Sequence, residues 1–126
     1  KVLAGSSFPF VCANLTKGQL AADPTKDELF LKPYVIVDKT VKDGAGAEHA
    51  IRIGLIGFVP PQIMTWDRKH LEGSVTVRDI VEAAEQLVPQ MREEGADIII
   101  ALNHSGIGAQ AHTEMMENAS IPLARQ

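Results

Sequence analysis

The sequence predicts an α/β domain built on a mixed β-sheet, and three observations lead to that class. Residues 98–102 form a continuous apolar run, which is typical of a central strand buried on both faces. Apolar residues repeat at helical spacing through residues 77–94. Two further strand-like segments flank a cluster of turn-forming residues between them. Together these patterns predict a β-hairpin followed by a right-handed βαβ unit.

The first half of the chain contains the expected hairpin. We expect a strand at residues 8–14 and an irregular connection through the polar residues 15–32. Residues 34–41 and 50–59 predict two strands, because both are apolar and rich in β-branched side chains. The segment between them, residues 42–48, contains two glycines and an aspartate, which favours a hairpin turn.

The second half completes the βαβ unit. We expect residues 62–73 to form a loop, followed by a helix over 77–94 with Thr76 as its N-cap and Asp79 as the capping-box partner. This helix connects the strand at 50–59 to a parallel strand at 97–102. A second helix is expected at Ala109–Ala119, with its methionines turned inward.

Composition limits the possible functions. The 126 residues are 45% hydrophobic and carry a net charge of −4, which suits one globular domain and not a nucleic-acid polymer as partner. No apolar run approaches the roughly 20 residues of a membrane span. The single cysteine, Cys12, excludes an internal disulfide, and its apolar neighbours predict a buried, inert thiol. Residues 1–5 resemble the last turn of a helix, so we interpret the sequence as an internal piece of a longer protein.

The strongest candidate for a functional residue is His104. It follows the apolar strand within the small-residue turn Asn103–His104–Ser105–Gly106, and ligands of open α/β sheets bind at such strand ends. A histidine there is a candidate metal ligand or acid/base, and the alternative is a histidine bonded to backbone. Ser105 and Gly106 are expected to shape the turn.

Other polar and aromatic residues have structural interpretations. We expect His49 and His70 at the surface, and His112 as a solvated or locally bonded helix residue instead of a second ligand. Trp66 and Asp67 could line a pocket, but a packed loop anchor with a capping carboxylate is favoured. Asn14 is expected to cap a structural element.

Several segments resemble one enzyme family. These are Ile51–Asp67 (IRIGLIGFVPPQIMTWD), Pro89–Arg92, Gly95–Asp97, His104–Gly106 and Phe8–Asn14. In this order they resemble the bacterial 2′,3′-cyclic-nucleotide 2′-phosphodiesterase/3′-nucleotidases, within the 5′-nucleotidase branch of the calcineurin-like metallophosphoesterases. The resemblance implies part of a four-layer α/β/β/α sandwich.

The resemblance also implies a chemistry. The family binds two divalent metals (Zn, Mn, Fe, Co and Mg are not distinguished), and its lone histidine before Ser/Gly matches His104. Its other metal motifs have no match here, so residues 1–126 would be a catalytic domain truncated at both ends, with the catalytic residues outside this segment. The implied substrates are nucleoside 2′,3′-cyclic phosphates and 3′-nucleotides, aided by a C-terminal substrate-binding domain, in a periplasmic or secreted enzyme. The alternative is a non-catalytic α/β scaffold or binding module.

Overall fold

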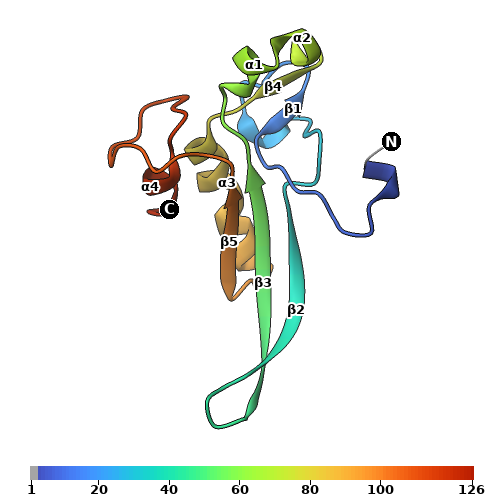
Figure 1. The fold of residues 1–126 in the computed structure, drawn as a ribbon, viewed down its shortest axis with the longest axis vertical. Helices are drawn as coiled ribbons and strands as arrows, with labels where there is room; N and C mark the ends of the chain where they lie inside the picture. The colour runs from blue at the N-terminus through green and yellow to red at the C-terminus, as the bar shows by residue number, and fades with distance from the viewer. Residues whose placement is uncertain (1–2) are drawn as a thin grey trace.

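The computed structural model describes residues 3–126, and its centre is a three-stranded mixed sheet (Figure 1). The strands are β2 (Tyr34–Lys42), β3 (Glu48–Phe58) and β5 (Ile98–Asn103), in the spatial order β2-β3-β5. β2 and β3 are antiparallel, and β3 and β5 are parallel. The predicted hairpin and the predicted βαβ connection are therefore both confirmed.

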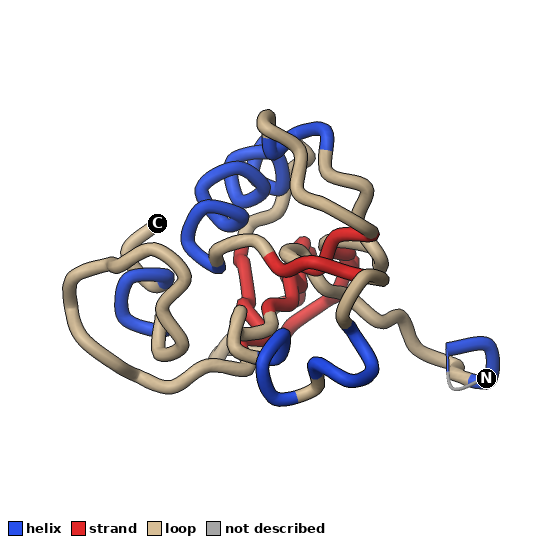
Figure 2. Tube along the Cα trace, turned by 90° about the horizontal axis from the view of Figure 1, so that it is seen from above, coloured by secondary structure: helices blue, strands red, loops and turns tan. Residues whose placement is uncertain are grey.

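Helix α3 (Ile80–Glu93) covers one face of this sheet, as Figure 2 shows. Ile56 and Phe58 of β3 are buried against the helix, because alternate side chains of a strand point to the same face. Gly54 lies on this face under Met91, and a Cβ at position 54 would collide with the Met91 methyl group. The core cluster consists of nine buried residues: Ala13, Ile56, Phe58, Ile80, Ala83, Ala84, Met91, Ala96 and Ala119.

The opposite face of the sheet is exposed within residues 3–126. Ile98, Ile100 and Leu102 of β5 are 45%, 43% and 55% exposed, and they alternate with the partly buried Ile99, which packs towards α3. The prediction of a central strand buried on both faces is therefore wrong for this chain. β3 is the central strand, whereas β5 is an edge strand with one covered face. An apolar run indicates that a strand can be buried, but it does not identify the elements that cover each of its faces.

A second, two-stranded sheet pairs β1 (Leu15–Lys17) with β4 (Val75–Val77) in antiparallel orientation. The predicted strand at residues 8–14 does not form, and only Val11 makes an isolated bridge, to Lys32. This segment crosses β3 closely, because a Cβ at Gly57 would meet the Val11 carbonyl. Two 3₁₀ turns, Leu3–Gly5 and Pro24–Lys26, complete the first half. Residues 1 and 2 of the predicted N-terminal helical turn lie outside the described residues.

The segment after β3 is more ordered than expected. Residues 62–73 form two one-turn helices, α1 (Ile63–Trp66) and α2 (Arg68–Leu71), instead of a loop. Thr76 is not the N-cap of α3, since it lies within β4. The cap is Asp79, whose carboxylate accepts hydrogen bonds from the Val81 and Glu82 amides at 2.9 and 3.1 Å.

The prediction of a second helix is also wrong. Residues 109–119 are irregular, and the one-turn helix α4 (Ser120–Leu123) follows directly after them. Gly108 and Met115 both have positive φ, at 67° and 60°, which a helix does not allow. The loop follows tertiary contacts, described below, which override the local spacing of its methionines.

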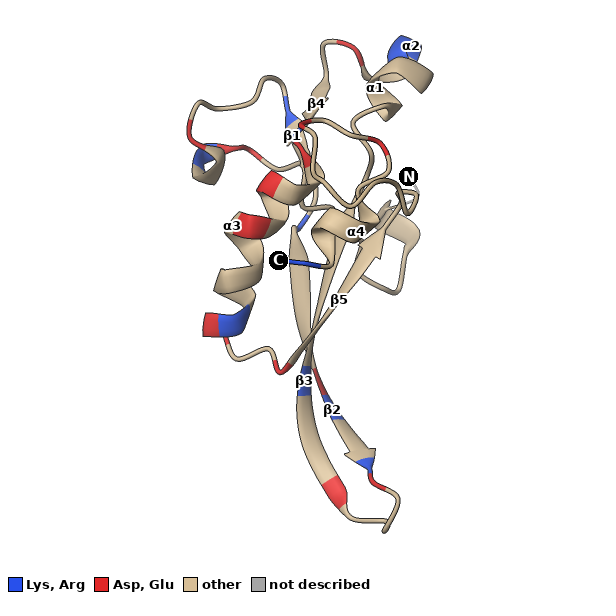
Figure 3. Cartoon of the chain, turned by 90° about the vertical axis from the view of Figure 1, so that its left-hand side faces the viewer, with Lys and Arg blue, Asp and Glu red and all other residues tan. Residues whose placement is uncertain are grey.

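Charged residues are spread along α3, the hairpin and the loops (Figure 3). The hairpin end formed by residues 38–50 projects beyond β5, and its side chains are exposed (Figure 1). None of the helices in residues 3–126 combines the length and hydrophobicity needed to cross a lipid bilayer.

Candidate functional site

A hollow of about 250 Å³ lies where the parallel strands β3 and β5 end. Strand β5 leads directly into it, and β3 leads to it through two prolines and helix α1. Its lining combines small, polar and aromatic residues: Pro60, Trp66, Asn103, His104, Ser105, Gly106 and Glu117. All four residues of the predicted strand-end turn are therefore brought together in one concave surface.

His104 is fixed by its backbone and open at its side chain. Its amide donates to the Phe58 carbonyl at 3.1 Å, which extends the β3–β5 ladder by one hydrogen bond beyond Asn103. The residue is exposed, and its ring forms no hydrogen bond with any group in residues 3–126. An imidazole held at the backbone with both nitrogens available can ligate a metal or exchange a proton.

Ser105 connects the turn to the segment just before α4. Its hydroxyl donates to the Glu117 carbonyl at 2.5 Å and accepts from the Ala119 amide at 2.7 Å. The Ser120 hydroxyl returns a hydrogen bond to the Ser105 carbonyl at 3.1 Å and accepts one from the Asn103 amide group at 3.1 Å. The Ser105 hydroxyl is engaged on both sides, so it serves to shape the turn, as the sequence predicted.

Gly106 lies beside the exposed side chain of Asn118. A Cβ at position 106 would meet the amide end of that side chain, which would have to shift. The closer approach is at Gly108, which has a positive φ and where a Cβ would collide with the Asn118 backbone carbonyl.

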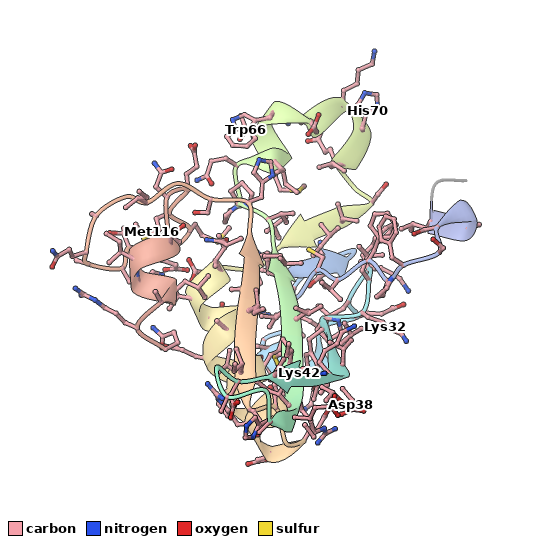
Figure 4. All side chains as sticks on the ribbon, turned by 60° about the horizontal axis from the view of Figure 1, so that its bottom comes forward. Lys32, Asp38, Lys42, Trp66, His70 and Met116 are labelled. Atoms are coloured by element: carbon pink, nitrogen blue, oxygen red, sulfur yellow. The ribbon has the colours of Figure 1, made fainter. Side chains whose placement is uncertain are left out.

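Trp66 differs from the sequence interpretation. It is 56% exposed, so it is not a packed loop anchor, and it forms one wall of the hollow. Figure 4 shows Trp66 on α1 on the side nearer the loop that follows β5, while His70 projects at the far end of α2. The signal that could have found it is topological. Trp66 follows the end of β3 by eight residues, and β3 is the parallel neighbour of the strand that carries His104.

Glu117 was not anticipated, because residues 109–119 were expected to form a helix. Among the described residues that line the hollow, Glu117 is the only one that is acidic, and none is a lysine or arginine. An anionic substrate would be repelled by it unless a cation were also bound.

The donors around the hollow are of the type that binds divalent metals. His104 offers an imidazole nitrogen, and Glu117 is an acidic residue of the same lining. The Asn103 side chain donates to Ser120, and Asn103 also lines the larger cavity described below, together with Ile99 and Ala101. Nevertheless, no three His, Cys, Asp or Glu side chains converge on one point anywhere in residues 3–126. The residues present suit a metal but supply only part of a ligand set.

His112 is neither a metal ligand partner of His104 nor a helix residue. Its Nε2 lies 3.0 Å from Oδ1 of the buried Asp79, and the Met115 amide donates to Oδ2 of the same carboxylate at 2.7 Å. Burial alone would raise the pKa of Asp79, but the hydrogen bonds from Glu82, His112 and Met115 outweigh it and lower the pKa. Asp79 therefore caps α3 and also holds the loop between His104 and α4.

The remaining predicted residues have structural roles. His49 and His70 are exposed, as expected, and His49 pairs with Asp43 at 2.8 Å. Cys12 is buried, and burial raises the pKa of its thiol, which disfavours the reactive thiolate. Asn14 is fully buried and bridges the end of β3 to Arg78, which confirms a structural role.

A larger cavity of about 530 Å³ lies between the sheet, α3 and α4. It is lined mainly by apolar side chains such as Ile56, Phe58 and Leu123, and it does not include His104. We place the candidate site in the smaller hollow, because only there do a free imidazole, a carboxylate and an aromatic face meet at strand ends.

Comparisons with known proteins show which proteins this chain is similar to. The chain is 50% identical over 122 residues to the trifunctional nucleotide phosphoesterase YfkN of Bacillus subtilis, covering 97% of this chain and 8% of that protein. It is 45% identical over 125 residues to the 2′,3′-cyclic-nucleotide 2′-phosphodiesterase/3′-nucleotidase of Yersinia enterocolitica, covering 99% of this chain and 18% of that protein. No protein-family model matches the chain.

A solved structure matches the fold. The crystal structure of the calcineurin-like phosphoesterase YfkN from Bacillus subtilis superimposes with a TM-score of 0.85 at 50% identity, over 97% of this chain and 34% of that one. The chain therefore has the fold of one part of a calcineurin-like phosphoesterase. Its sequence is homologous to one segment of the nucleotide phosphoesterases named above, and it spans between 8% and 18% of their lengths.

Proposed function

We propose that these residues form part of the catalytic domain of a longer, metal-dependent phosphoric ester hydrolase. Its substrates are nucleoside 2′,3′-cyclic phosphates and 3′-nucleotides, in line with the names of the homologues. The observation that carries the proposal is the exposed His104 ring at the carboxyl end of β5, in a hollow that also contains Glu117. The resemblance alone supports a periplasmic or secreted location and a separate C-terminal domain that binds the nucleotide.

Four residues of the hollow have distinct tasks in this proposal. The His104 imidazole would hold one of two divalent metals, and the remaining ligands would come from outside this segment. Bound metals of this kind polarise a phosphate and activate water for attack on phosphorus. Ser105 and Gly106 keep the turn narrow enough to fix the His104 backbone, and Asn103 ties the turn to α4 through Ser120.

The first test replaces His104 in the longer protein that contains this segment. His104→Ala should reduce metal content by one equivalent and lower kcat by about 100-fold or more, because a preorganised charge at the transition state is lost. Its free energy of unfolding should change by only about 1 kcal/mol, because an exposed strand-end ring makes few packing contacts. Metal content is measured by mass spectrometry, and kcat with 2′,3′-cyclic AMP and 3′-AMP.

The matched control is His70→Ala, which removes an exposed histidine outside the hollow. His112→Ala is unsuitable, because that ring holds the site loop through Asp79. Equal losses of activity in the His104 and His70 variants, or full metal content in His104→Ala, would contradict the assignment. A longer protein without any phosphoesterase activity would instead support the scaffold alternative.

A further inference from the structure

Trp66 is the feature of the hollow that the proposed chemistry leaves unexplained. It is the only tryptophan of the chain, and more than half of its surface is exposed. An indole combines a broad, flat apolar face with a single N–H donor. Trp66 contributes this aromatic face to the wall of the hollow that contains His104.

The backbone segment that carries Trp66 is anchored to the rest of the molecule. Pro60 is fully buried, and the Pro60–Pro61 pair begins the turn from β3 into α1, with the Ile63 amide donating to the Pro60 carbonyl at 3.1 Å. The Gln62 side chain donates to the Met115 carbonyl at 2.9 Å, which ties α1 to the loop held by Asp79. The indole is thus presented on an anchored backbone.

The lining of the hollow has two chemically different parts. The lining includes polar residues, among them His104 and Glu117, whose side chains suit cations and, through them, phosphate, and it includes the apolar Trp66 and Pro60. No lysine or arginine lines the hollow in the described residues, so a substrate's organic group would be held there by stacking and not by charge. A nucleotide has the matching division into a charged phosphate and a flat aromatic base.

We propose that Trp66 is a specificity-determining residue that stacks on the nucleobase of the substrate at the metal-bearing side of the site. This inference rests on the proposed function and deepens it. The indole face of Trp66 would contribute to nucleotide binding in addition to the proposed C-terminal nucleotide-binding domain. Stacking between a base and an aromatic side chain does not depend on which base is bound, so Trp66 would favour nucleotides over simple phosphate esters without selecting one base.

The test compares two substrates in the longer protein. Trp66→Leu should raise KM for 3′-AMP about fivefold or more, with kcat within about twofold, whereas KM for glycerol 2-phosphate should stay the same. Trp66→Phe should restore most of the affinity for 3′-AMP, because it keeps an aromatic face. His70→Ala serves as the matched control, since it alters an exposed residue of the adjacent helix α2.

A second measurement separates this inference from the proposed function. Adenosine binding is measured by calorimetry in EDTA, with ribose as the control ligand, so that neither metal nor hydrolysis is needed. We expect Trp66→Leu to weaken adenosine binding about fivefold or more and Trp66→Phe to retain it. If the protein hydrolyses neither ester, the proposed function fails while this measurement still decides the role of Trp66. Unchanged adenosine binding in Trp66→Leu, or an equal rise in KM for both esters, overturns the inference.

Discussion

At the scale of single residues, Asn14 joins two distant segments of the chain through buried hydrogen bonds. Its side-chain amide donates to the Val59 and Arg78 carbonyls at 2.8 and 2.9 Å, and its oxygen accepts from the Val59 amide at 3.0 Å. It therefore joins the end of β3 to the entrance of α3 without contributing to the chemistry. This geometry explains why a polar side chain is tolerated with no exposure at all.

Asn14→Leu should be strongly destabilising. The apolar side chain has a similar volume but leaves one amide and two carbonyls buried without partners, which should cost about 2–4 kcal/mol. Urea denaturation followed by circular dichroism measures this change. Asn118→Ala is the control, because Asn118 is exposed, and it should change stability by less than about 0.5 kcal/mol. Similar effects of the two substitutions would show that the Asn14 bridge contributes little.

At the scale of elements, one buried ion pair connects the segment after the Pro24–Lys26 turn to the start of α3. Arg78 donates to both carboxylate oxygens of Asp27, at 2.5 and 3.0 Å, and to Glu82 at 2.8 Å. The side chains of Arg78 and Asp27 are only 9% and 4% exposed. Burial alone would raise the pKa of Asp27, but the hydrogen bonds from Arg78 and the Ala21 amide outweigh it, so the pKa is lowered.

This lowered pKa predicts a loss of stability in acid. The folded state binds the Asp27 proton more weakly than the unfolded state, so the ion pair contributes its full stability above the unfolded pKa of 3.8. That contribution is lost as pH falls through the lower pKa of the folded state. Thermal unfolding between pH 2.5 and 7 should show a steeper decline below pH 4 in the native chain than in Asp27→Asn. Parallel curves for the two proteins would contradict the prediction.

The elements also show what the sequence could and could not reveal. The hairpin and the βαβ unit were predictable, because apolar β-branched runs, turn residues and helical spacing are local properties of 34–59 and 77–102. Residues 109–119 were not, since their course follows hydrogen bonds to Asp79, more than 30 residues away. The same limit applies to the site. His104 was recognisable from its place after a strand, whereas the placement of Trp66 and Glu117 depends on how two strand ends meet.

At the scale of the whole molecule, the face of the main sheet that points away from α3 is apolar and has no covering layer within residues 3–126. Ile98, Ile100 and Leu102 lie on this face with Val35 and Leu55 of the neighbouring strands. An apolar sheet face of this kind suits a second sheet packed against it, as in the four-layer sandwich that the resemblance implies. The matching segment makes up 34% of the solved Bacillus chain.

The 126-residue chain on its own should therefore bind a hydrophobic dye and self-associate, because its apolar face has no cover within residues 3–126. Replacing both Ile100 and Leu102 with threonine should lower dye fluorescence and shift sedimentation towards the monomer, while keeping β-propensity. Ile99→Thr is the matched control, because its side chain faces α3. That substitution should lower stability without reducing dye binding. If the double variant binds as much dye as the native chain, the exposed face is not the cause.

Two sets of contacts, one with α3 and one with the loop after β5, restrict which residue can occupy position 79. One short carboxylate caps α3, accepts from the Met115 amide and meets the His112 ring, so its length and its charge are both fixed by partners that are far apart in the chain. The longer side chain of glutamate would place the carboxylate beyond these partners. Serine could cap the helix, but it would lose the contacts with His112 and the Met115 amide. Homologues that keep a histidine at position 112 should therefore keep an aspartate at 79, and a change at either position should be tolerated only when the other changes with it.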